Sequence, residues 1–515
     1  MFCKSFCSAI IGVNACIVQV EADVSDGMPV FNLVGMLNSE VKEARERVRS
    51  AIRNLGYRFP PKRITLNMSP ADIRKSGTSF DLSIAFALMG AFGYISDSCF
   101  DSVLFIGELS LDGHINKVNG VLPMVIEAKE KGYKYCLVPE GNVSEGVLVG
   151  GIGIIGADTL AKAVDIVNMQ KFEDHKAAEA GWQPDGRRMC SKDYSDVSGQ
   201  HVARRAAEIA AAGGHNMLMI GTPGSGKTMI AERIPGILPM MTMEESIEVS
   251  GIYSVCGELD VGCGYMYERP FRAPHHSIPR TGLIGGGNYP VPGEISLSHK
   301  GVLFLDELTE FPRNIIELLR QPLENDYIVH ARSNITVKYP CDFILIAATN
   351  PCPCGYYPDR NKCRCSQIQI RKYLSKISHA FLDRIDLIVD VKPVSYDMLG
   401  SDICNESSET MRTRVERAYN IQKNRYAGTK YSLNSKLDIT GVKKWCRLAE
   451  EDREYLELMF ERLGLSARSY YSILKVARTI ADLDNCENIE KKHLTEAVFY
   501  QSLDKKYREF GGDLT

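Results

Sequence analysis

The chain has no long apolar segment and no excess of either charge. Its longest nearly apolar stretch, residues 82–95, is interrupted by Ser83, Gly90 and Gly93 and is shorter than the about 20 residues that cross a bilayer. We therefore expect no membrane span and no membrane partner. Lys and Arg total 61 against 64 Asp and Glu, a formal net charge of −3, which excludes a whole-molecule basic field for nucleic acid. Such binding would need a local patch or an assembled ring.

The N-terminal residues lack the pattern of a secretory signal. Ile17, Val18 and Val20 run directly into Glu21 without a small-residue cleavage site, and we interpret this segment as the first strand. The sixteen cysteines are scattered through a chain of 515 residues, which argues against a disulfide scaffold and predicts a reducing, cytoplasmic environment.

This length predicts about three domains. A polar, Gly- and Pro-containing stretch at residues 168–193 is typical of a linker. It separates an α+β region (1–167), in which a helix is expected from the N-cap Ser39 to Asn54, from an α/β region (194–395) and a helical region (396–515). Buried strands are predicted at 15–20, 63–67, 103–106, 134–138, 217–220, 302–305, 343–347 and 387–391.

The central region contains a phosphate-binding motif, GxxxxGK[ST]. Its residues are Gly221, Thr222, Pro223, Gly224, Ser225, Gly226, Lys227 and Thr228. The motif lies between an apolar strand and a predicted helix, which is the context its mechanism requires. Glycine backbone N–H groups surround phosphates, Lys227 supplies a point charge, and Thr228 is suited to ligate Mg²⁺.

A second apolar strand, residues 302–305, ends in two acids. Asp306 is placed to hold the Mg²⁺ shell, and Glu307 to orient or deprotonate the attacking water. A third strand ends in Asn350, a polar group that could sense the γ-phosphate. Arg384 and Arg468 follow; each alone is more typical of a surface cation.

The ordered series of motifs resembles the magnesium-chelatase-like branch of AAA+ ATPases. It comprises RPFRAPHHS (269–277), PGEISLSHKGVLFLDE (292–307), AATNPCPCG (347–355), FLDRIDL (381–387) and LSARSYYSILKVARTIADL (465–483). With its N-terminal region the whole chain resembles the YifB/ComM family. The resemblance implies a doubly wound P-loop domain with a helical lid, ATP and Mg²⁺ as ligands, and a ring, expected to be a hexamer. Arg384 would be an arginine finger toward a neighbour, and Arg468 the sensor-2 residue that binds ATP.

The same branch carries an insert, here about 255–298, and a hairpin, here 327–340, that face the central pore in related motors. The sequence of the hairpin predicts two strands around a tight turn. His330, Arg332 and Lys338 are then candidates to contact a DNA backbone. A solvated hairpin explains these residues equally well. The role of Pro274–His276 stays open between a loop-stabilising hydrogen bond and a ligand contact.

Four thiols lie within fourteen residues: Cys352, Cys354, Cys363 and Cys365. Four thiolates can close a tetrahedral Zn²⁺ site and fix a loop with no apolar anchor. We predict a structural zinc site with no catalytic role, against free or redox-labile cysteines.

Residues 63–90 and 104–139 resemble the proteolytic domain of Lon proteases, a fold of the ribosomal protein S5 domain 2 type. Ser79 falls at the nucleophile, but Leu122 stands where Lon has its catalytic lysine. Without a base the serine stays an ordinary alcohol, so we expect no peptidase activity. Arg45, Arg49 and Arg53 lie on one helix face, with Arg58, Lys62 and Arg63 after it, and are more typical of a solvated face than of a DNA stripe.

The sequence thus predicts an ATP-hydrolysing ring motor. By family resemblance, its substrate is single-stranded or branched DNA, and its work is helicase-like branch migration in homologous recombination during natural transformation. The alternative is a magnesium-chelatase-like ATPase that remodels a protein or metallocofactor client.

Overall fold

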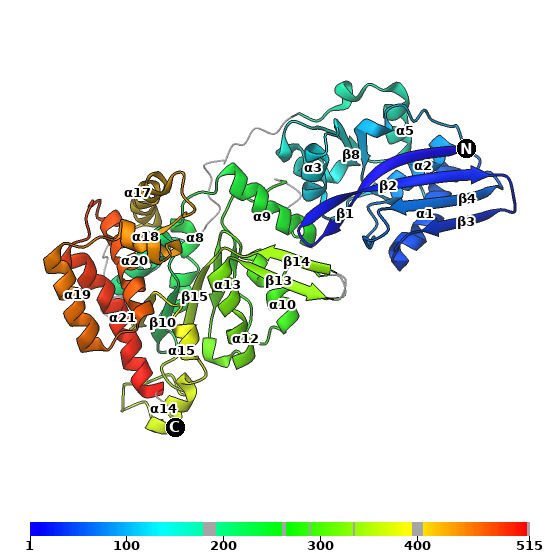
Figure 1. Cartoon of the computed structure of the whole chain (residues 1–515). Helices are drawn as coiled ribbons and strands as arrows, with labels where there is room; N and C mark the ends of the chain where they lie inside the picture. Colours follow the sequence, from blue (N-terminus) through cyan, green and yellow to red (C-terminus); the bar gives the residue numbers. More distant parts are fainter. Residues whose placement is uncertain (179–191, 260–263, 288–289, 333–334, 394–404, 512–515) are drawn as a thin grey trace.

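The computed structural model describes residues 1–178, 192–259, 264–287, 290–332, 335–393 and 405–511. It is a mixed α/β structure, with its N-terminal residues at one end and its C-terminal helices at the other (Figure 1). In the described residues no helix combines the length and apolar character needed to cross a bilayer.

The N-terminal part contains two main sheets. A four-stranded sheet has the order β1-β2-β4-β3, with β1 (Phe2–Ile11), β2 (Asn14–Ser25), β3 (Val30–Val34) and β4 (Arg63–Ser69). A parallel three-stranded sheet, β5-β8-β9, comprises β5 (Val103–Phe105), β8 (Tyr135–Pro139) and β9 (Gly153–Ala157). A short hairpin pairs β6 (Glu108–Leu109) with β7 (Ile115–Asn116). The helices are α1 (Ser39–Asn54), α2 (Asp81–Ala91), α3 (Val121–Glu130), α4 (Val143–Gly146) and α5 (Leu160–Met169).

The predicted helix 39–54 is confirmed as α1, but its cap is wrong. The N-cap residue is Asn38, and its side chain makes no capping hydrogen bond. The helix is held instead by its apolar stripe, since Val41, Val48 and Ile52 are buried. The predicted linker begins within this part of the chain, because the Ala177 N–H donates to the Ile154 carbonyl at 2.8 Å. Residues 179–191 of that linker lie outside the described residues.

The central part is built on a five-stranded parallel sheet of order β11-β12-β15-β10-β16. Its strands are β10 (Met217–Gly221), β11 (Phe271–Arg272), β12 (Val302–Leu305), β15 (Ile344–Thr349) and β16 (Leu387–Val391). The accompanying helices are α6 (His201–Gly213), α7 (Lys227–Ala231), α8 (Ile234–Ile237), α9 (Met243–Cys256), α10 (Arg280–Ile284), α11 (Glu294–Leu297), α12 (Arg313–Leu318), α13 (Arg320–Asn325), α14 (Gln367–Leu374) and α15 (His379–Leu382). The predicted parallel α/β core is confirmed. The predicted hairpin is also present, as β13 (Tyr327–Arg332) and β14 (Ile335–Pro340).

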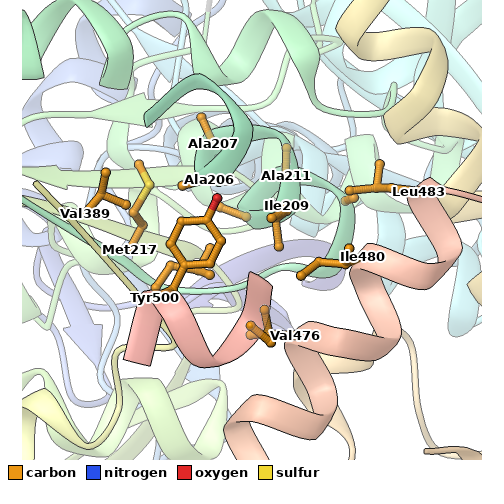
Figure 2. Close-up of a cluster of buried hydrophobic side chains, with 14 of the residues drawn as sticks. Ala206, Ala207, Ile209, Ala211, Met217, Val389, Val476, Ile480, Leu483 and Tyr500 are labelled. Atoms are coloured by element: carbon orange, nitrogen blue, oxygen red, sulfur yellow. The ribbon is translucent and has the colours of Figure 1, made fainter. Parts of the chain in front are cut away.

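The C-terminal part is helical. It consists of α17 (Ser408–Tyr426), α18 (Ile439–Trp445), α19 (Glu450–Leu463), α20 (Ala467–Leu483) and α21 (Lys491–Gly511). Figure 2 shows how it joins the central sheet: Val476 and Ile480 of α20 and Tyr500 of α21 lie against Ile209 of α6 and Met217 of β10. All five are at most 2% exposed. One continuous core therefore ties the C-terminal helices to the sheet.

The N-terminal and central parts touch through buried polar and apolar contacts. The Glu145 carboxylate accepts the Leu122 N–H at 2.8 Å and also the Ser254 hydroxyl of α9. The Gly120 N–H donates to the Ser254 carbonyl at 3.0 Å. At the β1–β2 turn, a Cβ on Gly12 would come within 2.1 Å of a Val337 methyl on β14. The N-terminal part thus packs directly against α9 and the β13–β14 hairpin.

Candidate ATP-binding site

The predicted phosphate-binding residues lie together at the carboxyl edge of the parallel sheet. β10 ends at Gly221, and the loop turns through Gly224 and Gly226, which have φ of +76° and +92°, into α7 at Lys227. Glycine is required there because a side chain disfavours this backbone region. The helix that follows the loop is short: α7 ends at Ala231, and a separate turn, α8, contains Pro235.

Lys227 is held over the loop by oxygen acceptors. Its ammonium donates to the carbonyls of Gly221 at 2.7 Å and Thr222 at 3.0 Å, and to Asn350 Oδ1 at 3.3 Å. Burial lowers the pKa of this lysine, and the nearby Asp306 and Glu307 carboxylates oppose that shift by raising it. The contact with Asn350 brings the predicted sensor, at the end of β15, to the phosphate-binding loop.

The two acids after β12 face the same loop. Asp306 Oδ2 accepts the Thr228 hydroxyl at 2.9 Å, and Asp306 Oδ1 accepts the Glu307 N–H at 2.9 Å. Hydroxyl and carboxylate oxygens are the ligands that Mg²⁺ uses beside phosphates. Thr228 and Asp306 therefore fit a magnesium ion bound together with a nucleotide.

Glu307 has an unusual backbone. Its φ is +51°, ψ +48°, a left-handed conformation that costs a non-glycine residue of order 1–3 kcal/mol and persists where surrounding structure enforces it. This side chain is 54% exposed, and its Oε2 lies 3.8 Å from His276 Nδ1. His276 follows β11, the strand next to β12, so it reaches the same edge. The geometry thus places His276, the second histidine of the Pro274–His276 motif, beside Glu307. The first histidine, His275, shares a hydrogen bond of 2.8 Å between its Nδ1 and Ser277 Oγ.

Gln200 is a neighbour of this loop that the sequence did not single out. Its amide donates to the Ser225 carbonyl at 3.0 Å and to the Lys392 carbonyl at 2.6 Å. It links the start of α6 to the loop and to the end of β16. No local motif marks it, because its partners are 25 and 192 residues away.

Arg384 and Arg468 are not at this edge. Asn216 stands just before β10 and donates to the Arg384 carbonyl at 3.0 Å, so Arg384 lies at the amino edge of the sheet. Arg468, at the start of α20, lies with it: both guanidinium groups contact Glu324, Arg468 at 3.4 Å. The three line a cleft of about 740 Å³. The structure thus does not bring Arg468 to the Lys227 of its own chain.

Arg384 is largely enclosed. Its side chain is 8% exposed; it also donates to the Ala380 carbonyl, and its Nε has no hydrogen-bond partner among the described residues. Burial, with the nearby Arg468 cation, lowers its pKa. Glu324 is the anion that this arginine pair shares.

Two of the three candidate DNA-contact residues of the hairpin, His330 and Lys338, contact other groups of the chain. The ring of His330 lies 2.8 Å from the Ile284 carbonyl of α10, and the Lys338 ammonium lies 4.0 Å from the centroid of the Tyr327 ring. Arg332 is in β13, and its side chain lies outside the described residues. The hairpin is therefore braced against α10 and the N-terminal part, and its DNA contacts stay a prediction.

The four predicted cysteines do come together. Their Sγ atoms all lie within 4.8 Å of one another. The backbone N–H of Tyr356 lowers the pKa of the Cys354 thiol to about 6, whereas burial raises that of Cys363 to about 12. Four sulfurs and no oxygen form a donor set of the structural zinc type.

In the N-terminal part, Ser79 is 5% exposed and Leu122 is fully buried. Lys75, also buried, donates its ammonium to the Pro70 carbonyl. In the basic helix, Arg45 pairs with Glu46 at 3.0 Å and Arg49 lies over the Phe59 ring.

Comparison with known proteins gives consistent matches along the chain. Residues 193–399 match the family model of magnesium chelatase, subunit ChlI; residues 20–142 match a second ChlI model, and residues 405–501 the ChlI C-terminal model. The chain is 42% identical to the YifB protein of Escherichia coli over 499 residues, and 40% identical to the competence protein ComM of Haemophilus influenzae over 499 residues, covering 96% of every chain. It is also 29% identical over 129 residues to Lon protease 2 of Bacillus subtilis, a quarter of the present chain.

Proposed function

The chain belongs to the YifB/ComM family of magnesium-chelatase-like proteins, and on this basis we propose that it is an AAA+ ATPase that works as a ring motor on DNA. The observation that carries the ATPase proposal is the convergence of Lys227, Thr228, Asp306 and Asn350 at one edge of the sheet.

Each residue has a role that its position supports. Lys227 binds the β- and γ-phosphate oxygens in place of the carbonyls it now contacts. Asn350 orients the terminal phosphate, and Glu307 accepts a proton from the attacking water. When bound, Mg²⁺ would be held by Thr228 and Asp306 and would neutralise phosphate charge.

The proposal requires a neighbouring subunit. Arg384 and Arg468 lie at the amino edge of the sheet, away from their own phosphate loop. We propose that they serve the nucleotide of the next protomer in a ring, expected to be a hexamer. Arg384 would stabilise charge as phosphoryl transfer proceeds, and Arg468 would bind the same ATP. For this, Glu324 must release Arg384.

The substrate proposed is single-stranded or branched DNA, moved by a helicase-like action in homologous recombination during natural transformation. The support is the similarity to a relative named a competence protein. His330, Arg332 and Lys338 of the hairpin are the proposed DNA contacts. Contacts with phosphates weaken with added salt, which gives the DNA step a signature.

The alternative is a client other than DNA: a protein or metallocofactor, as in magnesium chelatase. The matches to the ChlI models support it. ATP hydrolysis indifferent to every DNA would favour this alternative.

The test is ATP hydrolysis by the purified chain with and without single-stranded, duplex and four-way-junction DNA. Glu307→Gln is the blank, and removal of this base should lower kcat about 10²–10⁴-fold while ATP still binds. Glu310→Gln, three residues on, is the matched control. Stimulation by DNA with junction disassembly supports the motor; no hydrolysis by the unmutated protein refutes the ATPase proposal.

A further inference from the structure

The four-cysteine loop has the dimensions of a metal site. Cys352 Sγ lies 3.4 Å from Cys354 Sγ and 3.8 Å from Cys363 Sγ. In a tetrahedral site with Zn–S bonds of about 2.3 Å, adjacent sulfurs are about 3.8 Å apart. A disulfide would need about 2.05 Å. The observed separations therefore fit four sulfurs around one ion.

The surroundings of the sulfurs support the same reading. The Tyr357 N–H points at Cys352 Sγ at 3.4 Å, the type of outer contact that orients a metal ligand. Cys352 and Cys363 are at most 3% exposed and pack with Ile370 and Leu374 of α14. This apolar cluster is small, and an ion would add a direct cross-link between the two cysteine pairs.

The loop also rests on the nucleotide site. Asn350, the proposed sensor, is two residues before Cys352. Gly355 has a φ of +83°, and a Cβ added there would meet Pro223 of the phosphate loop at 2.6 Å and Asn350 Cγ at 3.9 Å. The loop thus contacts both the phosphate loop and the residue that Lys227 binds.

We propose that Cys352, Cys354, Cys363 and Cys365 bind one Zn²⁺, and that this ion holds Asn350 and Pro223 in the positions that ATP hydrolysis requires. The metal site rests on the geometry of the thiols alone; its link to hydrolysis rests on the proposed ATPase function. Binding releases thiol protons, since zinc takes thiolates. Its loss would free the loop from the phosphate site.

The experiment compares the full chain with Cys354→Ser, and with Cys256→Ser as the matched control, a half-buried thiol of α9 outside the cluster. Zinc content is measured by mass spectrometry, and a metallochromic dye reports the zinc that an organomercurial releases from the thiols. Nucleotide affinity is measured with a fluorescent ADP analogue, and kcat is measured for ATP hydrolysis. Thermal unfolding of each variant monitors the fold.

We expect about one zinc per chain in the unmutated protein and the control. In Cys354→Ser, zinc should fall and kcat drop at least about tenfold, and organomercurial treatment should release zinc and lower kcat in parallel. Restoring thiols and zinc should restore kcat. If the unmutated chain, produced with zinc, holds none, the site is refuted. If zinc leaves and neither kcat nor nucleotide affinity changes, the link is refuted. A chain that binds zinc and hydrolyses no ATP refutes the ATPase proposal alone, and the affinity measurement then decides the link.

Discussion

The placement of Arg384 predicts that two inactive variants restore each other. Arg384→Ala should lose hydrolysis because its neighbour lacks an arginine; loss of such a residue lowers kcat about 10³–10⁵-fold. Its own phosphate loop stays intact, since β10 spans 5 residues and, at about 3.3 Å per residue, separates the two sheet edges by about 13 Å. Nucleotide affinity of this variant should therefore be nearly unchanged.

Mixing Arg384→Ala with Glu307→Gln then assembles complete sites. An active interface needs the phosphate loop of the first variant next to the arginine of the second. In a random equal mixture of a head-to-tail ring, about a quarter of the interfaces meet this condition. We expect ATPase activity of about that fraction of the unmutated protein, after subunits have exchanged.

Arg320→Ala is the matched control. Arg320 is also an arginine in an ion pair, with Glu317 at 2.9 Å, and it is the first residue of α13, the helix that carries Glu324. Denaturation curves check that Arg384→Ala is folded. Arg384→Lys keeps the positive charge but lacks the planar guanidinium, and so tests whether charge alone is sufficient. If Arg384→Ala hydrolyses ATP normally, or if proven mixed rings regain no activity, the reasoning that this arginine acts across subunits fails.

Three further predictions concern side chains outside the nucleotide site. Asp482→Ala should lower the free energy of unfolding by about 3–5 kcal/mol, because the fully buried Asp482 carboxylate pairs with Arg425 and with the buried Arg478, whose cation would lose its partner; chemical denaturation measures it. Burial would raise the pKa of Asp342, but Lys436 and Lys300 lower it below its usual range, so its stabilisation is present above pH about 3.9, the unfolded pKa, and is lost as pH falls. The stability gap between unmutated protein and Asp342→Asn should shrink below that pH. Ser79→Ala should leave ATP hydrolysis unchanged, and the unmutated chain should cleave no casein.

Glu451→Ala on exposed α19 is the control for Asp482 and should cost less than about 0.5 kcal/mol. An equal cost at both sites would contradict the buried ion-pair argument. A constant gap for Asp342→Asn from pH 7 to 3 would contradict the linkage. Casein cleavage that Ser79→Ala abolishes would overturn the expectation of an inactive peptidase site.

The sequence was sufficient for the phosphate-binding loop because that structure is local. Gly221 to Thr228 carry the turn, the cation and the hydroxyl within eight residues, and the strand before them is marked by its apolar run. Asp306 and Asn350 each follow a strand of this sheet. Because the strands are parallel, their carboxyl ends, and therefore these two residues, lie at the same edge.

The missed features are contacts between distant segments. No sequence motif marks Glu324, and its two arginine partners come from distant segments: Arg384 follows α15, and Arg468 is at the start of α20. The motif around Arg468 does not say which subunit's ATP this residue would bind, and the direction of α20 places it at the amino edge of the sheet, beside Glu324. No local pattern encodes such a placement, which depends on how the C-terminal helices pack on the sheet.

The contact at Glu145 places Leu122 in a buried joint between the N-terminal part and α9. In this chain the backbone N–H of Leu122 is bound by that carboxylate, which also holds Ser254 of α9, and the Leu122 side chain is fully buried. Restoring a lysine at 122 would require burying its long side chain and placing an ammonium in this enclosed interface, at a cost of several kcal/mol unless a partner is found. A lysine at the position where the resemblance to Lon places the catalytic base would therefore have to be accommodated by repacking this joint.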